Sequence, residues 1–337
     1  MTPSPASSRG LTRRRFIVVA ATVAVLLAAG VGLASLVANQ RPDELGDTWA
    51  WDGQTWTQLS PVSGPSNRSA ASMAYDARSK VAILFGGSAG ARCFADTWTW
   101  EGSAWHRRAA GLSPPARGTA GMAYDEATAS TLLFGGGCSG GVEFNDTWTW
   151  DGQAWTQQRP ATSPSPRLNP SLAYDAAQGR VVLFGGFSGG RPLDDTWTWD
   201  GHSWTRESTT SSPAGMALIA YDGTRGVVVA FGGISPNGHG GGNDTWTWNG
   251  RSWTEQNPSS RPRSRIGATL TDDPDTGRVL LFAGAEGPAV LNDTWSWDGS
   301  TWTQEQPATQ PPARQGASSG YGGPRHGVIL LGGQRGH

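Results

Sequence analysis

Short apolar runs bounded by glycine, and short runs in which bulky and smaller side chains alternate, recur through most of the chain. The run Val181–Phe184 is wholly apolar, which is typical of a strand buried on both faces. In Trp98–Trp100 a threonine separates two tryptophans, so both indoles lie on one side of a strand. An Asp-Gly or Asn-Gly pair with two further residues follows such runs and indicates a tight hairpin turn. Because no segment after residue 40 has helical periodicity of useful length, the pattern predicts an all-β protein.

The predicted strands belong to a repeat with a step of 49 or 50 residues. All 18 tryptophans lie in six copies of one phrase, which starts as Asp-Thr-Trp-Ala-Trp-Asp-Gly at Asp47. The first tryptophans of the copies are Trp49, Trp98, Trp148, Trp197, Trp246 and Trp295. Each unit holds four strands, A to D. In the first complete unit they are expected at about Ser69–Tyr75, Val81–Phe85, Thr97–Trp100 and Trp105–Arg108.

Two further phrases keep the same step. Strand B ends in Phe-Gly-Gly in four copies, with departures at Phe282-Ala283-Gly284 and Leu331-Gly332-Gly333. An arginine precedes strand A, and strand A ends in a tyrosine. The arginines are Arg68, Arg117, Arg167, Arg265 and Arg314, and the tyrosines are Tyr75, Tyr124, Tyr174, Tyr221 and Tyr321. The fourth copy has Ala214 at the arginine position, and the fifth has Asp272 at the tyrosine position.

These phrases resemble the Kelch repeat, which combines the arginine, the hydrophobic run ending in a glycine pair, and a tryptophan after a tight turn. The resemblance covers Asp47 to Gly333. It implies a six-bladed β-propeller of four-stranded antiparallel blades, similar to the central domain of galactose oxidase. Tryptophan replaces the family's usual tyrosine at the end of strand C, so the chain resembles a divergent, tryptophan-rich branch. A C–D pair opens the repeat region (Asp47–Gln58) and an A–B pair closes it (Arg314–Gly333), so one blade is expected to combine both ends.

The repeated tryptophans are expected to form the core between the blades. A buried aromatic side chain removes about 150–250 Å² from water, and no tryptophan departs from the repeat frame. The alternative is that some of them are exposed platforms for sugar rings. The content of 48 glycines and 22 prolines fits a turn-rich β protein, because periodic tryptophan supplies the core that a disordered chain lacks.

The N-terminal region predicts export and a membrane anchor. Phe16–Ala38 contains 23 residues without a charge and follows Arg13–Arg15, which places the N-terminus in the cytoplasm and the propeller outside. Residues 1–15 are then a cytoplasmic segment, 16–38 a transmembrane helix, 39–46 a linker and 47–337 the propeller. Thr12–Ile17 also resembles a twin-arginine export signal. The alternative is therefore a cleaved signal and a secreted protein, with cleavage near Gly32–Ala34.

Charge and composition exclude several classes of function. Residues 16–337 carry 22 basic and 27 acidic side chains, a net charge of −5, which argues against nucleic-acid binding. Copper radical oxidases occur among Kelch-type propellers, but here the tyrosines belong to the repeat and the five histidines cannot converge. Asp273–Gly277 resembles the start of a calcium loop, but Gly284 stands where a bidentate glutamate is required. No metal, cofactor or catalytic residue is therefore predicted.

Binding is expected at the rim that carries the B–C loops. Antiparallel order places the A–B and C–D turns on one rim, here called the turn rim, and the longer B–C and D–A connections on the other, the loop-rich rim. Variable loops on a rigid scaffold are where binding usually occurs. Candidate binding residues are Phe94, Phe144 and Phe187 in B–C loops, and the five repeat arginines at the start of strand A. The alternatives are phenylalanines tucked under their own loops, and arginines paired with the repeat aspartates.

Cys93 and Cys138 lie in neighbouring B–C loops. In an exported domain two cysteines suggest a disulfide bond, and two free thiols are the alternative.

The sequence favours a membrane-anchored binding protein or scaffold for an unknown protein or cell-surface glycan. One alternative is a metal-independent sugar enzyme, like the Kelch-type sialic-acid mutarotases, for which Glu143, Arg191, Asp194 and Glu286 are available. Another is a passive structural module of the envelope.

Overall fold

The computed structural model describes residues 44–336, apart from residues 110, 139 and 235–241. The apolar segment 16–38, predicted to cross a membrane, lies outside them. Within the described residues, no helix is both long enough and apolar enough to cross a bilayer. The anchor therefore stays a prediction.

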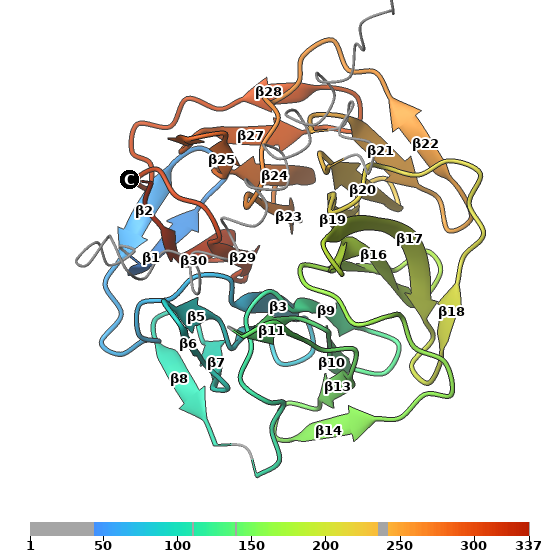
Figure 1. The fold of residues 1–337 in the computed structure, drawn as a ribbon. Coiled ribbons are helices and arrows are strands. Elements are labelled where there is room, and N and C mark those ends of the chain that lie inside the picture. The colour runs from blue at the N-terminus through green and yellow to red at the C-terminus, as the bar shows by residue number, and fades with distance from the viewer. Residues whose placement is uncertain (1–43, 110, 139, 235–241, 337) are drawn as a thin grey trace, which may run out of the picture. The chain divides into compact units, whose positions relative to one another are not determined.

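Six four-stranded antiparallel sheets surround a central axis, as predicted, and the molecule is a six-bladed β-propeller (Figure 1). Five blades follow one another along the chain. Blade 1 contains β3 (Ser72–Asp76), β4 (Val81–Phe85), β7 (Thr97–Trp100) and β8 (Trp105–Arg108). Blade 2 contains β9 (Gly121–Asp125), β10 (Ser130–Phe134), β13 (Thr147–Trp150) and β14 (Trp155–Gln158). Blade 3 contains β15 (Ser171–Asp175), β16 (Arg180–Ser188), β17 (Arg191–Trp199) and β18 (Trp204–Arg206).

Blade 4 contains β19 (Leu218–Asp222), β20 (Val227–Phe231), β21 (Thr245–Trp248) and β22 (Trp253–Gln256). Blade 5 contains β23 (Thr269–Asp273), β24 (Arg278–Phe282), β27 (Thr294–Trp297) and β28 (Trp302–Gln304). In each blade the A strand lies nearest the centre and the D strand at the periphery (Figure 1). The four strands of the first repeat unit were located correctly from the sequence, within three residues at each end.

Both ends of the propeller meet in the closing blade, as the sequence predicts. It joins β1 (Glu44–Trp51) and β2 (Trp56–Leu59) to β29 (Ser318–Tyr321) and β30 (Val328–Gln334). Strands β1 and β30 are antiparallel, and Trp49 pairs with Leu330. Strand β1 starts at Glu44, three residues before the first copy of the tryptophan phrase.

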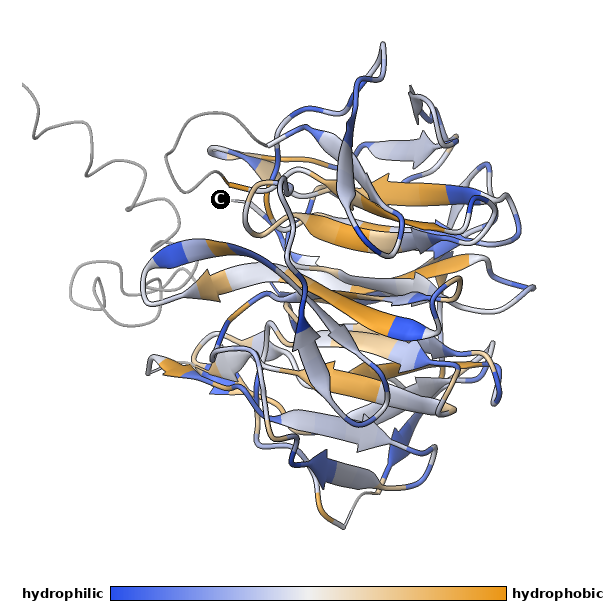
Figure 2. Ribbon diagram, turned by 90° about the vertical axis from the view of Figure 1, so that its right-hand side faces the viewer, coloured by the Kyte–Doolittle hydropathy of each residue, from blue (hydrophilic) through white to orange (hydrophobic). Residues whose placement is uncertain are grey.

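The core is divided among the interfaces between neighbouring blades. Between blades 2 and 3, Leu132 and Phe134 pack against Leu172, Leu183 and the tryptophans of blade 3. The orange hydrophobic segments in Figure 2 lie along strands, and the blue segments gather at strand ends and turns. Most of the tryptophans are buried, and only Trp98, Trp246 and Trp295 are half-buried.

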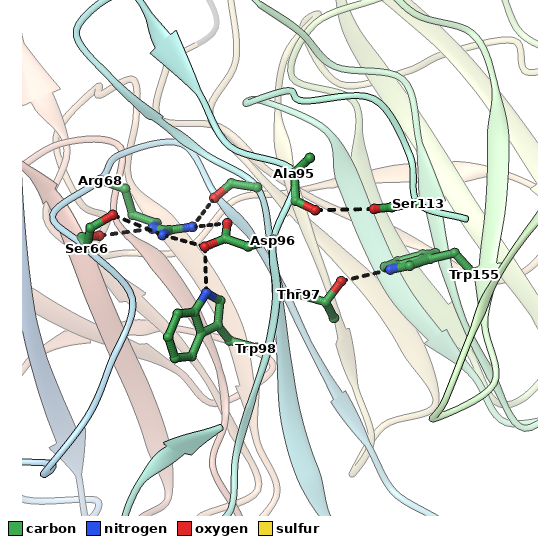
Figure 3. Close-up of polar contacts among 9 residues, drawn as sticks. Ser66, Arg68, Ala95, Asp96, Thr97, Trp98, Ser113 and Trp155 are labelled. Carbon is green, nitrogen blue, oxygen red and sulfur yellow. Dashed lines mark hydrogen bonds and ion pairs between the residues drawn. The ribbon is translucent and has the colours of Figure 1, made fainter. Parts of the chain in front are cut away.

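The tryptophan of each D strand binds the preceding blade. Its indole N–H donates to the hydroxyl of the first threonine of the preceding C strand, as Trp155 does to Thr97 at 2.8 Å (Figure 3). The other pairs, at 2.8–3.1 Å, are Trp56–Thr294, Trp105–Thr48, Trp204–Thr147, Trp253–Thr196 and Trp302–Thr245. These buried hydrogen bonds cross every interface of the ring.

The loop-rich rim carries short hairpins above blades 1, 2 and 5. They are β5 (Ser88–Ala89) with β6 (Arg92–Cys93), β11 (Gly137–Cys138) with β12 (Val142–Glu143), and β25 (Ala285–Glu286) with β26 (Ala289–Val290). In blade 3, β16 and β17 themselves extend into the same type of hairpin, with a register shift between Phe184 and Gly186.

Candidate functional site

The repeat arginines are buried beneath the loop-rich rim, with exposed fractions of 0–4%. Each makes a two-pronged ion pair with the aspartate that starts strand C, as Arg68 does with Asp96 at 2.7 and 3.0 Å (Figure 3). The other pairs are Arg117–Asp146, Arg167–Asp195, Arg265–Asp293 and Arg314–Asp47. This arrangement matches the structural alternative for the arginines.

Backbone carbonyls accept two further hydrogen bonds from each guanidinium. Arg68 Nη1 donates to the carbonyl of Gly86 at 2.8 Å, and Nε donates to that of Ser66 at 3.0 Å. The equivalent bonds recur at the other four arginines at 2.9–3.1 Å. A ligand at this rim would therefore meet guanidinium groups that are buried and already hydrogen-bonded.

The five aspartates that pair with repeat arginines are held in the charged form. Burial alone raises the pKa of Asp96, but hydrogen bonds from Arg68 and from the indole of Trp98 outweigh it, so the pKa lies below its usual value. The same balance lowers the pKa of Asp47, Asp146, Asp195 and Asp293. In these five blades the indole N–H of the first tryptophan donates to the aspartate at 2.7 Å.

Two of the candidate phenylalanines cover arginines. The guanidinium carbon of Arg68 lies 4.2 Å from the centre of the Phe94 ring, and that of Arg117 lies 4.0 Å from the Phe144 ring. Such cation–π contacts strengthen when water is excluded. Phe94 is 9% exposed and Phe144 is half-buried. Phe187, also half-buried, belongs to strand β16 and exchanges backbone hydrogen bonds with Leu168.

We call the position two residues before each repeat aspartate the lid position. Phe94 and Phe144 occupy it in blades 1 and 2, where they cover the repeat arginines of those blades. Leucine takes this position in the closing blade and in blades 3 and 5, as Leu45, Leu193 and Leu291. The lid carbonyl of one blade accepts the backbone N–H of the next arginine, as Phe94 does from Arg117 at 3.0 Å. The leucines were not predicted as part of the site, although their fixed distance from the aspartate marks them in the sequence.

The B–C hairpins are linked to one another along part of the rim. Cys93 and Cys138 form a disulfide bond between blades 1 and 2, with their Cα atoms 5.9 Å apart. The carboxylate of Glu44, in the closing blade, accepts the amide of Gly90 at 2.8 Å. The hydroxyl of Ser188, in blade 3, donates to Glu143 of blade 2 at 2.7 Å. These contacts form a braced collar that runs from the closing blade to blade 3.

The side chains considered for a sugar enzyme do not form one group. Glu143 bonds Ser188, whereas Glu286 lies 3.7 Å from Arg263 between blades 4 and 5. Arg191 and Asp194 are exposed on blade 3. Two cavities, of about 240 and 590 Å³, lie at the turn rim between neighbouring blades, lined by residues such as Asp273 and Arg278, or Asp76 and Glu101.

Histidines and acidic groups do not form a metal site in the described part of the chain, where no cluster of three or more such side chains has suitable geometry. His239, the one histidine in a B–C loop, lies outside the described residues.

Asp272 replaces a tyrosine that in other blades reaches the A–B turn of the preceding blade. Tyr321, for example, donates to Asp275 at 2.8 Å. Burial, and then the neighbouring charges of Asp222 and Asp273, raise the pKa of Asp272 to about 7, and the amide of Gly223 opposes this shift. Arg225 forms an ion pair with Asp222 at 2.9 Å. The interface between blades 4 and 5 therefore contains a carboxyl group that is easily protonated.

We expect the Asp272→Asn variant to lose part of the pH dependence of unfolding. The folded pKa is raised, so the stability from Asp272 is complete below about pH 4 and falls as the pH rises towards about 7. Three pKa units correspond to at most about 4 kcal/mol. Urea unfolding of both proteins at several pH values measures the difference. A constant difference across this window would show that Asp272 has an ordinary pKa.

Comparisons with known proteins add no family to this picture. No protein-family model matches the chain, and a search of curated proteins finds no match.

Proposed function

We propose that this protein is a membrane-anchored, extracytoplasmic propeller of the Kelch type that binds a protein or a surface glycan through its loop-rich rim. β-Propellers commonly serve as binding platforms. The apolar segment 16–38 supplies the anchor in this proposal, and the arginines before it set the orientation. The disulfide bond between Cys93 and Cys138 is typical of proteins that leave the cytoplasm.

The braced collar is the observation that carries the proposal. Loops that are already fixed lose little conformational entropy when a partner binds, which favours affinity. The disulfide bond and the contact of Glu143 join the hairpins of blades 1 to 3, and Glu44 joins strand β1 of the closing blade to the hairpin of blade 1. At the hairpin tips Arg92, Val142 and Arg191 are exposed, and Val142 is 50% exposed. These side chains are available to a partner without any rearrangement of the rim.

Crosslinking on intact cells, followed by purification of the full-length protein, tests this proposal. A collar variant combines Arg92→Glu, Val142→Asp and Arg191→Glu, and a matched turn-rim variant changes the exposed residues Lys80, Gln153 and Arg251 to glutamate. The collar variant should lose the crosslinked partner, whereas the turn-rim variant should keep it. Loss in the turn-rim variant alone would place binding on the opposite rim.

The anchor and its orientation have their own test. The full-length protein should stay in the membrane pellet after carbonate extraction, and protease added outside intact cells should reach the propeller. A soluble mature protein that begins after residue 34 would show that the segment is a cleaved signal.

A further inference from the structure

Five blades contain the same receptor for a guanidinium group, and each fills it with its own arginine. The receptor consists of the aspartate at the start of strand C and a backbone carbonyl at the end of strand B, with phenylalanine or leucine at the lid position. In blade 3, Arg167 occupies it, bonding to Asp195 at 2.6 and 3.0 Å and to the carbonyl of Gly185 at 2.9 Å. The indole of Trp197 holds the aspartate from its other side at 2.7 Å.

Blade 4 keeps the receptor groups but lacks both the arginine and the lid. Asp244 and Trp246 stand at the repeat positions, and Gly232 follows strand β20 as Gly185 follows the core of β16. Ala214 replaces the arginine and Gly242 replaces the lid residue. Ala214 and Gly242 are the only departures of this kind among the six copies of these two positions.

The carboxylate of Asp244 is accessible, unlike those of the other blades. Its side chain is 31% exposed, compared with 14–20% for the five paired aspartates. Arg261, itself 33% exposed, approaches it only to 3.6 Å. Trp246 is half-buried, and its indole is not among the five that donate to a repeat aspartate.

The two replacements are chemically consistent with each other, because the loss of the lid residue offsets the cost of losing the arginine. Loss of the arginine alone would leave a carboxylate buried without a partner, which is costly. Loss of the lid side chain as well lets solvent reach the carboxylate. The aspartate that is paired in the other blades is therefore an open acceptor in blade 4. The backbone N–H of Gly232 donates to the carbonyl of Asp244 at 2.9 Å, as that of Gly86 does to Asp96 at 3.1 Å. A carboxylate and a carbonyl together suit a planar, two-pronged donor, and a compact ammonium group does not match them.

We propose that blade 4 binds a guanidinium group in trans, in the position that the repeat arginine takes in the other blades. The group is an arginine side chain of the partner protein. This identification of the source rests on the proposed function of the loop-rich rim, whereas binding of the guanidinium group itself does not.

The indole N–H signal of Trp246 in the ¹⁵N-tryptophan-labelled full-length protein reports on this site. The signal is assigned by its loss in a Trp246→Phe variant, and ethylguanidinium and ethylammonium serve as probes. Ethylguanidinium should shift the signal to saturation, and ethylammonium should bind about tenfold more weakly or not at all. A short peptide with one central arginine should bind at least as tightly as free L-arginine. Tighter binding of the free amino acid would overturn the assignment to a protein partner.

Variants separate this site from a general effect of the probes. Asp244→Asn should weaken binding by about tenfold or more, whereas the exposed neighbour change Asp194→Asn should leave it unchanged. Ala214→Arg should fill the receptor, abolish the response and move the Trp246 signal towards those of the aspartate-bonded indoles. Arg261→Gln should strengthen binding by removing a competing cation.

The inference is overturned if neither the wild type nor the Arg261→Gln variant shows a saturable shift. It is also overturned if the Ala214→Arg variant responds to the probe as the wild type does. Either would leave the crosslinking test of the collar unaffected. Conversely, loss of rim binding in cells would leave this titration intact, so the two proposals fail separately.

Discussion

Removal of Arg314–His337 is expected to abolish the cooperative unfolding of the propeller. This deletion takes away β29 and β30, which form half of the closing blade. Strand β1 would then lose its pairing with β30, and Asp47 would lose the guanidinium of Arg314. The apolar residues Trp49, Trp51 and Trp56 would lose Val328 and Leu330 from their cluster. Thermal unfolding followed by near- and far-ultraviolet circular dichroism should show a broad transition, or none.

Removal of residues 335–337 alone is the control, because these residues follow the last strand. This shorter deletion should leave the transition sharp and its midpoint nearly unchanged. If the longer deletion also melts sharply at the wild-type midpoint, closure by both ends of the chain does not determine the stability of the ring.

Replacement of Arg167 by alanine is expected to cost about 3–5 kcal/mol of unfolding free energy at neutral pH. Arg167 is fully buried, and Asp195 would keep its burial while losing its main counter-charge. Urea unfolding measures the loss, and a double-mutant cycle with Asp195→Asn isolates the energy of the pair. The exposed change Arg191→Ala in the same blade is the control for a lost positive charge, and it should cost little.

Acid should reduce the difference between wild type and Arg167→Ala. The arginine lowers the folded pKa of Asp195, so the stability from that carboxylate is complete above about pH 4 and is lost as the pH falls below it. A protonated aspartate no longer needs the guanidinium. If the difference between the two proteins does not depend on pH in this acidic range, a packing defect rather than the ion pair accounts for the loss.

The architecture could be predicted from the sequence because its signal repeats. Six copies of the tryptophan phrase fixed the number of blades, and the order of phrases at the two ends predicted the closing blade. The alternation in Trp98–Trp100 placed both indoles on one side of strand C, where they take part in packing between blades. A single copy would have supported far less, because short apolar runs also occur in buried helices.

The character of the candidate site was harder to predict, because it depends on how residues from different strands meet. Phe94 and Phe144 were visible as loop phenylalanines, but only the positions of Arg68 and Arg117 show that their rings cover cations. The departures at Ala214 and Gly242 lie 28 residues apart and gain meaning together only when the other blades show that both positions belong to one guanidinium receptor. Asp272 is visible in the sequence as a departure from tyrosine, but its raised pKa arises from burial in the fold and then from the charges of Asp222, in the neighbouring blade, and Asp273.

The hydrogen bonds from D-strand tryptophans to threonines all run in one direction, from each blade to the one before it. Every contact between blades is therefore heterologous, like the head-to-tail contacts of a cyclic oligomer, and the ring has no terminal member. Where the polypeptide begins and ends is then independent of how the ring is held together. A circularly permuted propeller, with its old ends joined and new ends between β28 and β29, would retain all of these tryptophan hydrogen bonds. The position of the chain ends and the contacts that hold neighbouring blades together are thus separate properties of this protein.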